Sequence, residues 1–325
     1  MLRTRMIAFL LVSFLLFSGT AEALVTCHPL ESPNKDFKMV IYNGPLGSQI
    51  SFAVFYKGSL VATVSQPVFE VANDDELPAT ASFTLRHLRD GDDGPVPKPS
   101  RFKSDIGGGE TKSIRNVEGQ ADYDEYTFKY RRRKEGRGEL RPGTSYNPDD
   151  YEGIVNVVFR AYDDGIAYRY EIAAKEEETI TLKNELTEFS FPDDYALEDS
   201  VASLSKIGGE HPSPLLMKIP DVPALTFGEV SHKGFAVLRF KPGREWGENT
   251  FSNLFDFDGK VDRTGKVTAV ALNLDGDTVI QGNGIPYRTP WRYMKITSPD
   301  SEGMIESLTE SSGCVGIVHG SECMR

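Results

Sequence analysis

Apolar and polar residues alternate most regularly between Gly153 and Ile172, and this stretch predicts a β-hairpin. Two alternating runs meet at Asp163-Asp164-Gly165, a composition that favours a tight hairpin turn. The apolar positions share one face, which we expect to join the core: Val155, Val157, Phe159, Ala161, Ile166, Tyr168, Tyr170 and Ile172. Arg160, Arg169 and Glu171 take the opposite parity, and we expect that face to meet solvent, with a site lining as the alternative.

Short alternating runs separated by Gly, Pro, Asn and Asp recur along the rest of the chain and predict further strands. These runs span residues 37–42, 50–56, 60–64, 81–88, 111–115, 126–130, 179–182, 187–191, 225–228, 234–240, 267–274, 278–281 and 291–296. Residues 195–223 lack alternation and indicate a long loop. Beyond the N-terminal segment, no window of a dozen residues has helical periodicity. The pattern predicts an all-β fold, a large antiparallel β-sandwich.

The first residues have the pattern of a secretory signal peptide. Arg3 and Arg5 precede an apolar run from Met6 to Phe17, and Ala21-Glu22-Ala23 then provides small residues before a cleavage point. We expect residues 1–23 to be removed and the chain to be secreted, to the periplasm if the source is bacterial. The apolar run is short for a membrane span, so an uncleaved anchor is the weaker alternative.

Charge narrows the range of partners. The 325 residues carry 48 acidic against 36 basic side chains, a formal net charge of −12, which argues against a nucleic-acid partner. Basic residues concentrate only at Arg131-Arg132-Arg133-Lys134. We expect a solvated insertion loop there, and binding of an anionic polymer or proteolytic processing are the alternatives.

The three cysteines lie near the ends of the chain. Cys27 follows the expected cleavage point, and Cys314 and Cys323 are in the last dozen residues. A bridge between the two ends and a bridge from Cys314 to Cys323 are both open, and either leaves one thiol over. None of the three has the spacing of a metal site.

The sequence contains no known catalytic motif. It has no HExxH, no GxSxG and no phosphate-binding loop, and its five histidines are scattered without ligand spacing. The acidic runs at 256–259 and 273–277 resemble pieces of calcium loops but lack the twelve-residue pattern, so we interpret them as hairpin turns. We therefore assign no catalytic residue.

Several segments in order resemble the N-terminal domain of glycoside hydrolase family 97. They are SPNK at 32–35, FAVFYKGSLV at 52–61, VVFRAYDDGIAYRYEI at 157–172, TEFSFPDD at 187–194, TPWRYMKI at 289–296 and GMIES at 303–307. The resemblance implies a large β-sandwich of the super-sandwich type over residues 24–307. In that family a (β/α)8 barrel follows, and its carboxylates hydrolyse α-glucosidic or α-galactosidic bonds. Residues 308–325 do not resemble the family and are expected to be an irregular tail.

The resemblance also implies a metal ligand. In calcium-dependent members, a Glu in the loop after the TEF strand shares the metal with barrel carboxylates, and by position this residue is Glu198. Calcium takes six to eight oxygen ligands, so one Glu would need the partner domain to complete the site.

Three residues are candidates for contact with carbohydrate. Trp291 and Arg292 match the family pattern, although a Trp at a strand start is also a common core anchor. Trp246 lies in a polar segment and could stack on a sugar. Residues 234–240 lack the His and Glu that many family members have there, which weakens the expectation of retained sugar contacts.

Three functions follow from these observations. The first is the accessory sandwich of a secreted α-glycosidase, supporting carbohydrate binding and the active site of a barrel that is missing here, in which case the chain is truncated. The second is a stand-alone secreted carbohydrate-binding domain, and the third is an interaction domain without sugar contact. A sandwich that normally packs against a barrel is expected to expose an apolar interface when alone.

Overall fold

The computed structural model consists mainly of β-strands. It describes residues 26–43, 50–65, 69–72, 75–77, 102–104, 110–118, 120–133, 151–174, 176–185, 187–192, 195–197, 210–219, 223–230, 235–242, 268–296 and 303–311.

The strands and the one described helix follow the chain in this order: β1 (Thr26–Glu31), β2 (Phe37–Asn43), β3 (Ile50–Tyr56), β4 (Ser59–Ser65), β5 (Phe69–Val71), β6 (Asp75–Leu77), β7 (Phe102–Ser104), β8 (Glu110–Ile114), β9 (Tyr123–Arg133), β10 (Tyr151–Tyr162), β11 (Gly165–Ile172), β12 (Thr179–Glu185), β13 (Glu188–Phe191), β14 (Ala196–Leu197), β15 (His211–Pro212), β16 (Leu215–Lys218), β17 (Leu225–Glu229), β18 (Leu238–Pro242), β19 (Thr268–Leu274), β20 (Thr278–Gln281), β21 (Tyr287–Arg288), β22 (Arg292–Ile296) and α2 (Met304–Ser311).

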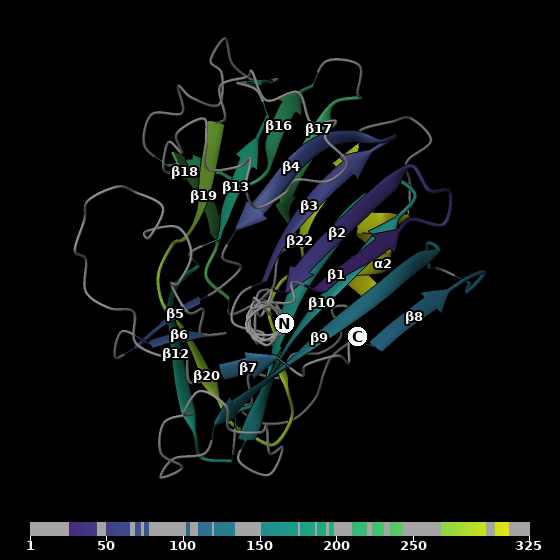
Figure 1. The fold of residues 1–325 in the computed structure, drawn as a ribbon. Helices are drawn as coiled ribbons and strands as arrows, with labels where there is room; N and C mark the ends of the chain where they lie inside the picture. The colour runs from purple at the N-terminus through teal and green to yellow at the C-terminus, as the bar shows by residue number, and fades with distance from the viewer. Residues whose placement is uncertain are drawn as a thin grey trace, which may run out of the picture.

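Two large antiparallel sheets face each other. One has the order β1-β2-β3-β4-β13-β19-β18-β15, and the other has the order β14-β16-β17-β22-β11-β10-β9-β7 with β8 and β21 attached. Figure 1 shows β1 to β4, in purple and blue, in front of β10 and β22. A smaller sheet, β20-β12-β5-β6, lies at one end of the molecule. The predicted fold class, a large antiparallel β-sandwich, is confirmed.

The predicted central hairpin is present. β10 and β11 pair from Val155↔Ile172 to Tyr162↔Gly165, with Asp163 and Asp164 in the turn. All eight apolar positions assigned to the inner face are buried in the main core, which also includes Phe52, Phe189 and Phe227 from other strands. The alternation places one face of each strand inward, and burial of those aromatic and branched side chains is the main force holding the two sheets together.

The opposite face of the hairpin was expected to meet solvent, but its arginines are buried. Arg160 and Arg169 are only 6% and 4% exposed, and Glu171 is half-buried. Trp291 and helix α2, which come more than a hundred residues later in the chain, cover this face, and Figure 1 shows α2 behind the strands. A local pattern cannot reveal such a cover, because it reports only which residues share a face.

Two regions expected to be loops contain strands. Residues 195–223 include β14, β15 and β16, and β16 pairs with β17 to extend the larger sheet. Arg131, Arg132 and Arg133 end strand β9, where the chain pairs with β10 on one side and, at Arg131 and Arg132, with β7 on the other. Pairing on both sides makes Arg131 and Arg132 poor protease sites, since a protease must bind an extended backbone whose hydrogen-bonding groups are free.

Helix α2 was not predicted, because eight residues are too few for a clear helical period. The boundary expected after residue 307 falls inside this helix. The predicted strand at 81–88 lies outside the described residues, as do residues 1–23 and the side chains of all three cysteines.

Candidate functional site

The segments that carry the family resemblance, far apart in sequence, meet around the central hairpin. The Asn34 backbone N–H donates to Asp163 Oδ1 at 2.7 Å, which joins the turn between β1 and β2 to the hairpin turn. The Ile296 N–H donates to the Asp164 carbonyl at 2.9 Å, and Thr289 Oγ1 accepts from the Tyr170 N–H at 3.0 Å. The segments therefore act as internal connections of the sandwich.

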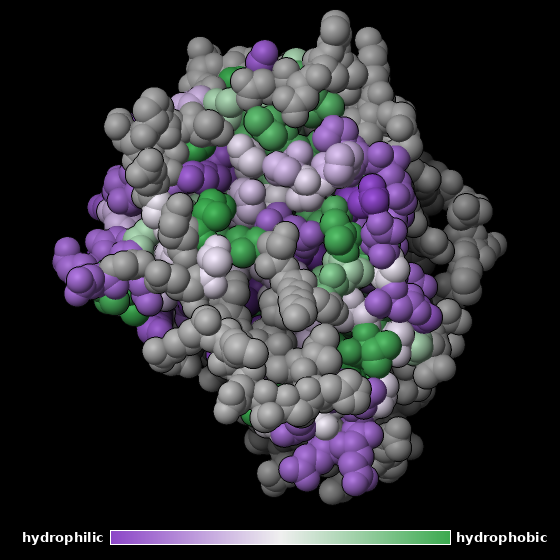
Figure 2. Space-filling view, turned by 180° about the vertical axis from the view of Figure 1, so that it is seen from behind, coloured by the Kyte–Doolittle hydropathy of each residue, from purple (hydrophilic) through white to green (hydrophobic). Residues whose placement is uncertain are grey.

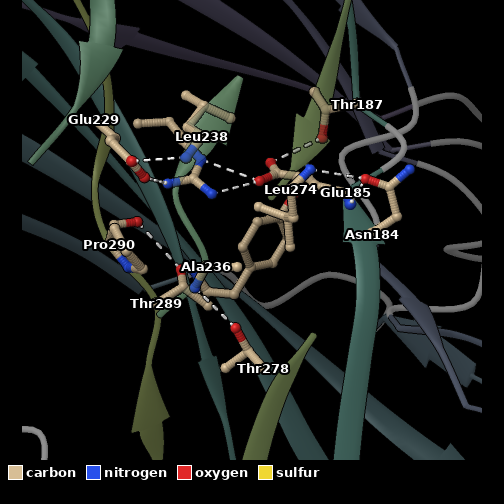
Figure 3. A network of polar contacts seen from close by, with 12 residues as sticks. Asn184, Glu185, Thr187, Glu229, Ala236, Leu238, Leu274, Thr278, Thr289 and Pro290 are labelled. Atoms are coloured by element: carbon tan, nitrogen blue, oxygen red, sulfur yellow. Dashed lines mark hydrogen bonds and ion pairs between the residues drawn. The ribbon is translucent and has the colours of Figure 1, made fainter. Parts of the chain in front are cut away.

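The Arg292 guanidinium is a buried, charged group of this region. Its Nε and Nη2 donate to Glu185 Oε2 at 3.0 and 2.7 Å, and its Nη1 donates to Glu229 Oε2 at 2.6 Å. Arg292 is 1% exposed and Glu185 is fully buried. Glu185 and Glu229 come from β12 and β17, and Figure 3 shows both carboxylates with their contacts as dashed lines.

Both carboxylates of this inner arginine network, Arg292 with Glu185 and Glu229, have further partners. Glu185 Oε1 accepts from Thr187 Oγ1 at 3.1 Å and from the Tyr168 hydroxyl at 3.4 Å. Glu229 Oε1 accepts from the Leu238 N–H at 2.8 Å. The charges are thus paired and hydrogen-bonded, which is the condition under which buried ions are tolerated.

The electrostatics follow from burial and pairing. Burial alone would lower the pKa of Arg292, but Glu185 and Glu229 outweigh it and raise the pKa above its ordinary value. Burial and the nearby Glu185 charge raise the pKa of the Tyr168 hydroxyl well above its ordinary value. Arg292 therefore stays charged and Tyr168 stays protonated at all physiological pH values.

This arrangement is suited to a structural role. Glu185 and Glu229 share one guanidinium, and each of their carboxylate oxygens accepts a hydrogen bond from a group of the chain. Among the residues whose placement is described, no group of three or more His, Cys, Asp and Glu side chains could hold a metal ion.

A second group of polar residues covers the outer face of the hairpin. The guanidinium carbons of Arg160 and Arg169 lie 4.5 and 4.4 Å from the Trp291 ring, and Arg160 also lies 4.3 Å from the Tyr123 ring. Stacking of guanidinium on aromatic rings is a favourable cation–π geometry. We call Arg160, Trp291 and Arg169 the outer arginine layer.

Carboxylates pair with both ends of the outer arginine layer. Arg160 Nε donates to Glu125 at 2.7 Å and Arg169 Nη2 donates to Glu171 at 2.8 Å, while Arg288 Nε lies 3.3 Å from the same Glu171 oxygen. Burial lowers the pKa of Arg169 to about 10, and the positive charges of Arg288 and Arg160 act in the same direction as burial. Arg169 still carries its charge at neutral pH.

The structure places two of the four residues predicted to form a site. Trp291 and Arg292 are 0% and 1% exposed, and they point to opposite faces of the larger sheet. This burial fits the core-anchor role of Trp291, and the predicted contact with carbohydrate stays a prediction for both residues. Glu198 and Trp246 lie outside the described residues.

The partners of Arg292 were not predicted from the sequence. Glu185 and Glu229 stand at strand ends with no motif around them, so nothing in their neighbourhood indicated a pair. Arg160 and Arg169 were recognised as sharing a face, and only their burial was missed.

The fold and these clusters define the chain as a large two-sheet β-sandwich domain with buried, paired arginines. The family model for the glycosyl-hydrolase 97 N-terminal domain matches residues 30–309. The chain therefore belongs to this family of N-terminal domains, as the resemblance predicted.

Solved structures of a glycoside hydrolase family 97 enzyme from Pseudoalteromonas sp. strain K8 are similar in fold. The complex with acarbose is 16% identical, has a TM-score of 0.50, and is matched over 83% of this chain and 35% of its own length. A single-residue variant, and another variant in complex with panose, give the same values. The chain thus spans about a third of the length of these enzymes. Comparison with curated protein sequences gave no significant match.

Proposed function

We propose that this chain is the N-terminal accessory β-sandwich of a secreted α-glycosidase. In this role it supports the active site of a (β/α)8 barrel and contributes to carbohydrate binding, and it does not hydrolyse glycosides alone. The observation that carries the proposal is the family match over residues 30–309, which covers both large sheets except most of β1, and most of α2.

The contacts of the family-like segments support this role. Their polar side chains tie the hairpin to the opposite sheet and join β12, β17 and β22 through Arg292. A scaffold with such internal connections holds its loops in fixed positions, and an active site built at a domain boundary requires that rigidity.

Carbohydrate binding is proposed for the assembled enzyme. Of the Phe, Tyr and Trp side chains that the structure describes, none is exposed. Trp246 remains the aromatic candidate on this chain. Calcium is proposed at Glu198, with its other oxygen ligands supplied by the barrel.

The apolar interface with a barrel stays a prediction. On the face seen in Figure 2, the hydrophobic residues that are coloured form several separate groups, with hydrophilic residues between them. Exposed aliphatic side chains among the described residues include Val237, Val279 and Ile285.

A chimaera tests the proposal. Residues 30–309 would replace the matching region of the Pseudoalteromonas enzyme, and hydrolysis of p-nitrophenyl α-glucoside and α-galactoside would be measured for the chimaera and for this chain alone. We expect activity only from the chimaera. A Glu198→Gln chimaera should need more calcium for half-maximal activity, with Glu188→Gln, a half-buried Glu on strand β13, as the matched control.

Two outcomes would contradict the proposal. Hydrolysis by the chain alone would show that it contains its own catalytic groups. A folded chimaera without activity, combined with glycan binding by the chain alone that Trp246→Ala abolishes, would support a stand-alone binding domain instead.

A further inference from the structure

Helix α2 packs on the sandwich through a small contact that is separate from the main core. Met304 and Leu308, four residues apart and therefore on one helix face, are both 0% exposed. They pack with Tyr123, Val158 and Trp291 in a cluster distinct from the large core between the sheets. Thr309, on the other side of the helix, is exposed.

We call the surface on which α2 packs, formed by Tyr123, Val158, Trp291 and Gly165, the seat. The hairpin turn, which ends at Gly165, forms one end of it. A Cβ atom placed on Gly165 would lie 2.9 Å from Met304 Sδ and 2.2 Å from the Met294 carbonyl oxygen, so the helix and β22 both approach this backbone closely. Glycine is the residue that allows this approach. At the start of the helix, Gly303 has a φ of +121°, a conformation that other residues adopt only with strain.

The seat contains an unfavourable feature. Trp291 Nε1 is buried and has no hydrogen-bond partner, although a buried indole N–H normally finds one. Such an unpaired donor lowers the stability of the closed arrangement, because water would satisfy the N–H if the cover were removed. An eight-residue helix is also too short to be stable by itself in water, so α2 depends on its seat.

We infer that α2 is a latch. It is hinged at Gly303, it closes over the outer arginine layer through Met304 and Leu308, and it opens without unfolding the core between the sheets. While closed, it fixes the position from which the chain continues beyond residue 311. The inference deepens the proposed function and rests on it for its biological meaning, since the latch would set how a following domain sits against the sandwich.

The test uses the full chain with Trp246→Phe, which leaves Trp291 as the single tryptophan reporter. Leu308→Asp places a charge in the seat, and Thr309→Asp places the same charge on the exposed side of the same helix. For Leu308→Asp we expect amide exchange in residues 303–311 at least about tenfold faster and stronger quenching of Trp291 by acrylamide. Exchange of β10 and β11 should be unchanged. Thr309→Asp should match the parent chain in all three measurements.

Two results would overturn the inference. If Leu308→Asp leaves the exchange of α2 unchanged, this seat does not hold the helix. If β10 and β11 exchange faster together with α2, the helix is an integral part of the core. Should Leu308→Asp fail to fold, Leu308→Ala gives the same comparison with a smaller perturbation. All of these measurements concern this chain alone, so an inactive chimaera would refute the proposed function without affecting them.

Discussion

Trp291 and Arg292 are neighbours in the chain but belong to two very different environments. Alternation along β22 directs Arg292 into the space between the sheets, where two carboxylates bind it, and directs Trp291 outward, where two guanidinium groups stack on it. The inner arginine network joins three strands through charged hydrogen bonds. The outer arginine layer has partly exposed carboxylates and depends on a short helix for its cover. The charge of Arg292 is therefore enclosed between the sheets, whereas the charges of Arg160 and Arg169 are enclosed by the cover on the outer face of the hairpin.

The strongest test of the inner arginine network is Arg292→Met. It leaves Glu185 and Glu229 buried without their shared cation, and we expect a loss of about 3–5 kcal/mol in the free energy of unfolding. Urea denaturation of the purified chain measures this loss of unfolding free energy. The double variant Glu185→Met with Arg292→Met should recover much of this loss, because the completely buried charge pair is then replaced by apolar side chains. A loss below about 1 kcal/mol for Arg292→Met would mean that the network does not stabilise the fold.

A second test exploits the unpaired indole of the outer arginine layer. Trp291→Phe keeps an aromatic face for Arg160 and Arg169, removes the unpaired N–H and leaves space where the larger indole ring was. Removal of the N–H partly offsets the cost of that space, and we expect a net loss of roughly 1 kcal/mol in the free energy of unfolding. Trp291→Leu removes the ring as well and should cost about 3 kcal/mol. Equal losses for the two variants, measured by thermal unfolding, would argue against stacking as the stabilising interaction.

The exposed rim of the outer arginine layer should contribute little. Arg288 has 44% of its side chain exposed and shares Glu171 with Arg169. We expect Arg288→Ala to change the unfolding free energy by about 0.5 kcal/mol or less, and 1 M salt should remove that difference. The Arg292→Met effect should persist in the same salt. An Arg288→Ala loss that is large and insensitive to salt would show that Glu171 needs both arginines.

The smallest expected effect is the pH dependence at His28, which lies outside both arginine clusters. Its ring stacks on Tyr126 with the centroids 4.9 Å apart, and burial lowers its pKa below the ordinary value of 6.5. The unfolded chain therefore binds a proton at His28 more readily than the folded chain. The stability that neutral His28 contributes is present above pH 6.5 and is lost as the pH falls through the folded-state pKa. Below pH 6, His28→Gln should raise the melting temperature relative to the parent chain by roughly 1 °C, with no such gain at pH 8. An equal difference at both pH values would exclude titration of His28 as the cause.

Much of the fold could be predicted because strand alternation is a local property. The inner face of the β10–β11 hairpin, its turn at Asp163-Asp164 and most of the strands followed from the sequence pattern. The short strands β14 to β16 did not, since two to four residues give no period. Helix α2 was missed for the same reason, as its two turns contain only one strongly buried pair.

The candidate site was less predictable than the fold. Trp291 and Arg292 were identified through the family resemblance, but their burial could not be, and Glu185 and Glu229 were not identified at all. Glu185 and Arg292 are 107 positions apart, and no local signal connects residues at that separation. Only the pairing of β22 with β11 and β17, and the position of Glu185 at the end of β12 within hydrogen-bonding distance of Arg292, bring the three charges together.

The sequence by itself determined which side of most strands is apolar, and hence that the chain forms a β-sandwich, while its motifs carried the resemblance to this family. The tertiary structure decided what each polar face contacts. Alternation depends on neighbouring residues along one strand, whereas the environment of a charge depends on elements that arrive from anywhere in the chain. For that reason Arg160 and Arg169, which the pattern placed on a solvated face, are covered by Trp291 and α2, and Arg292 is enclosed between two carboxylates.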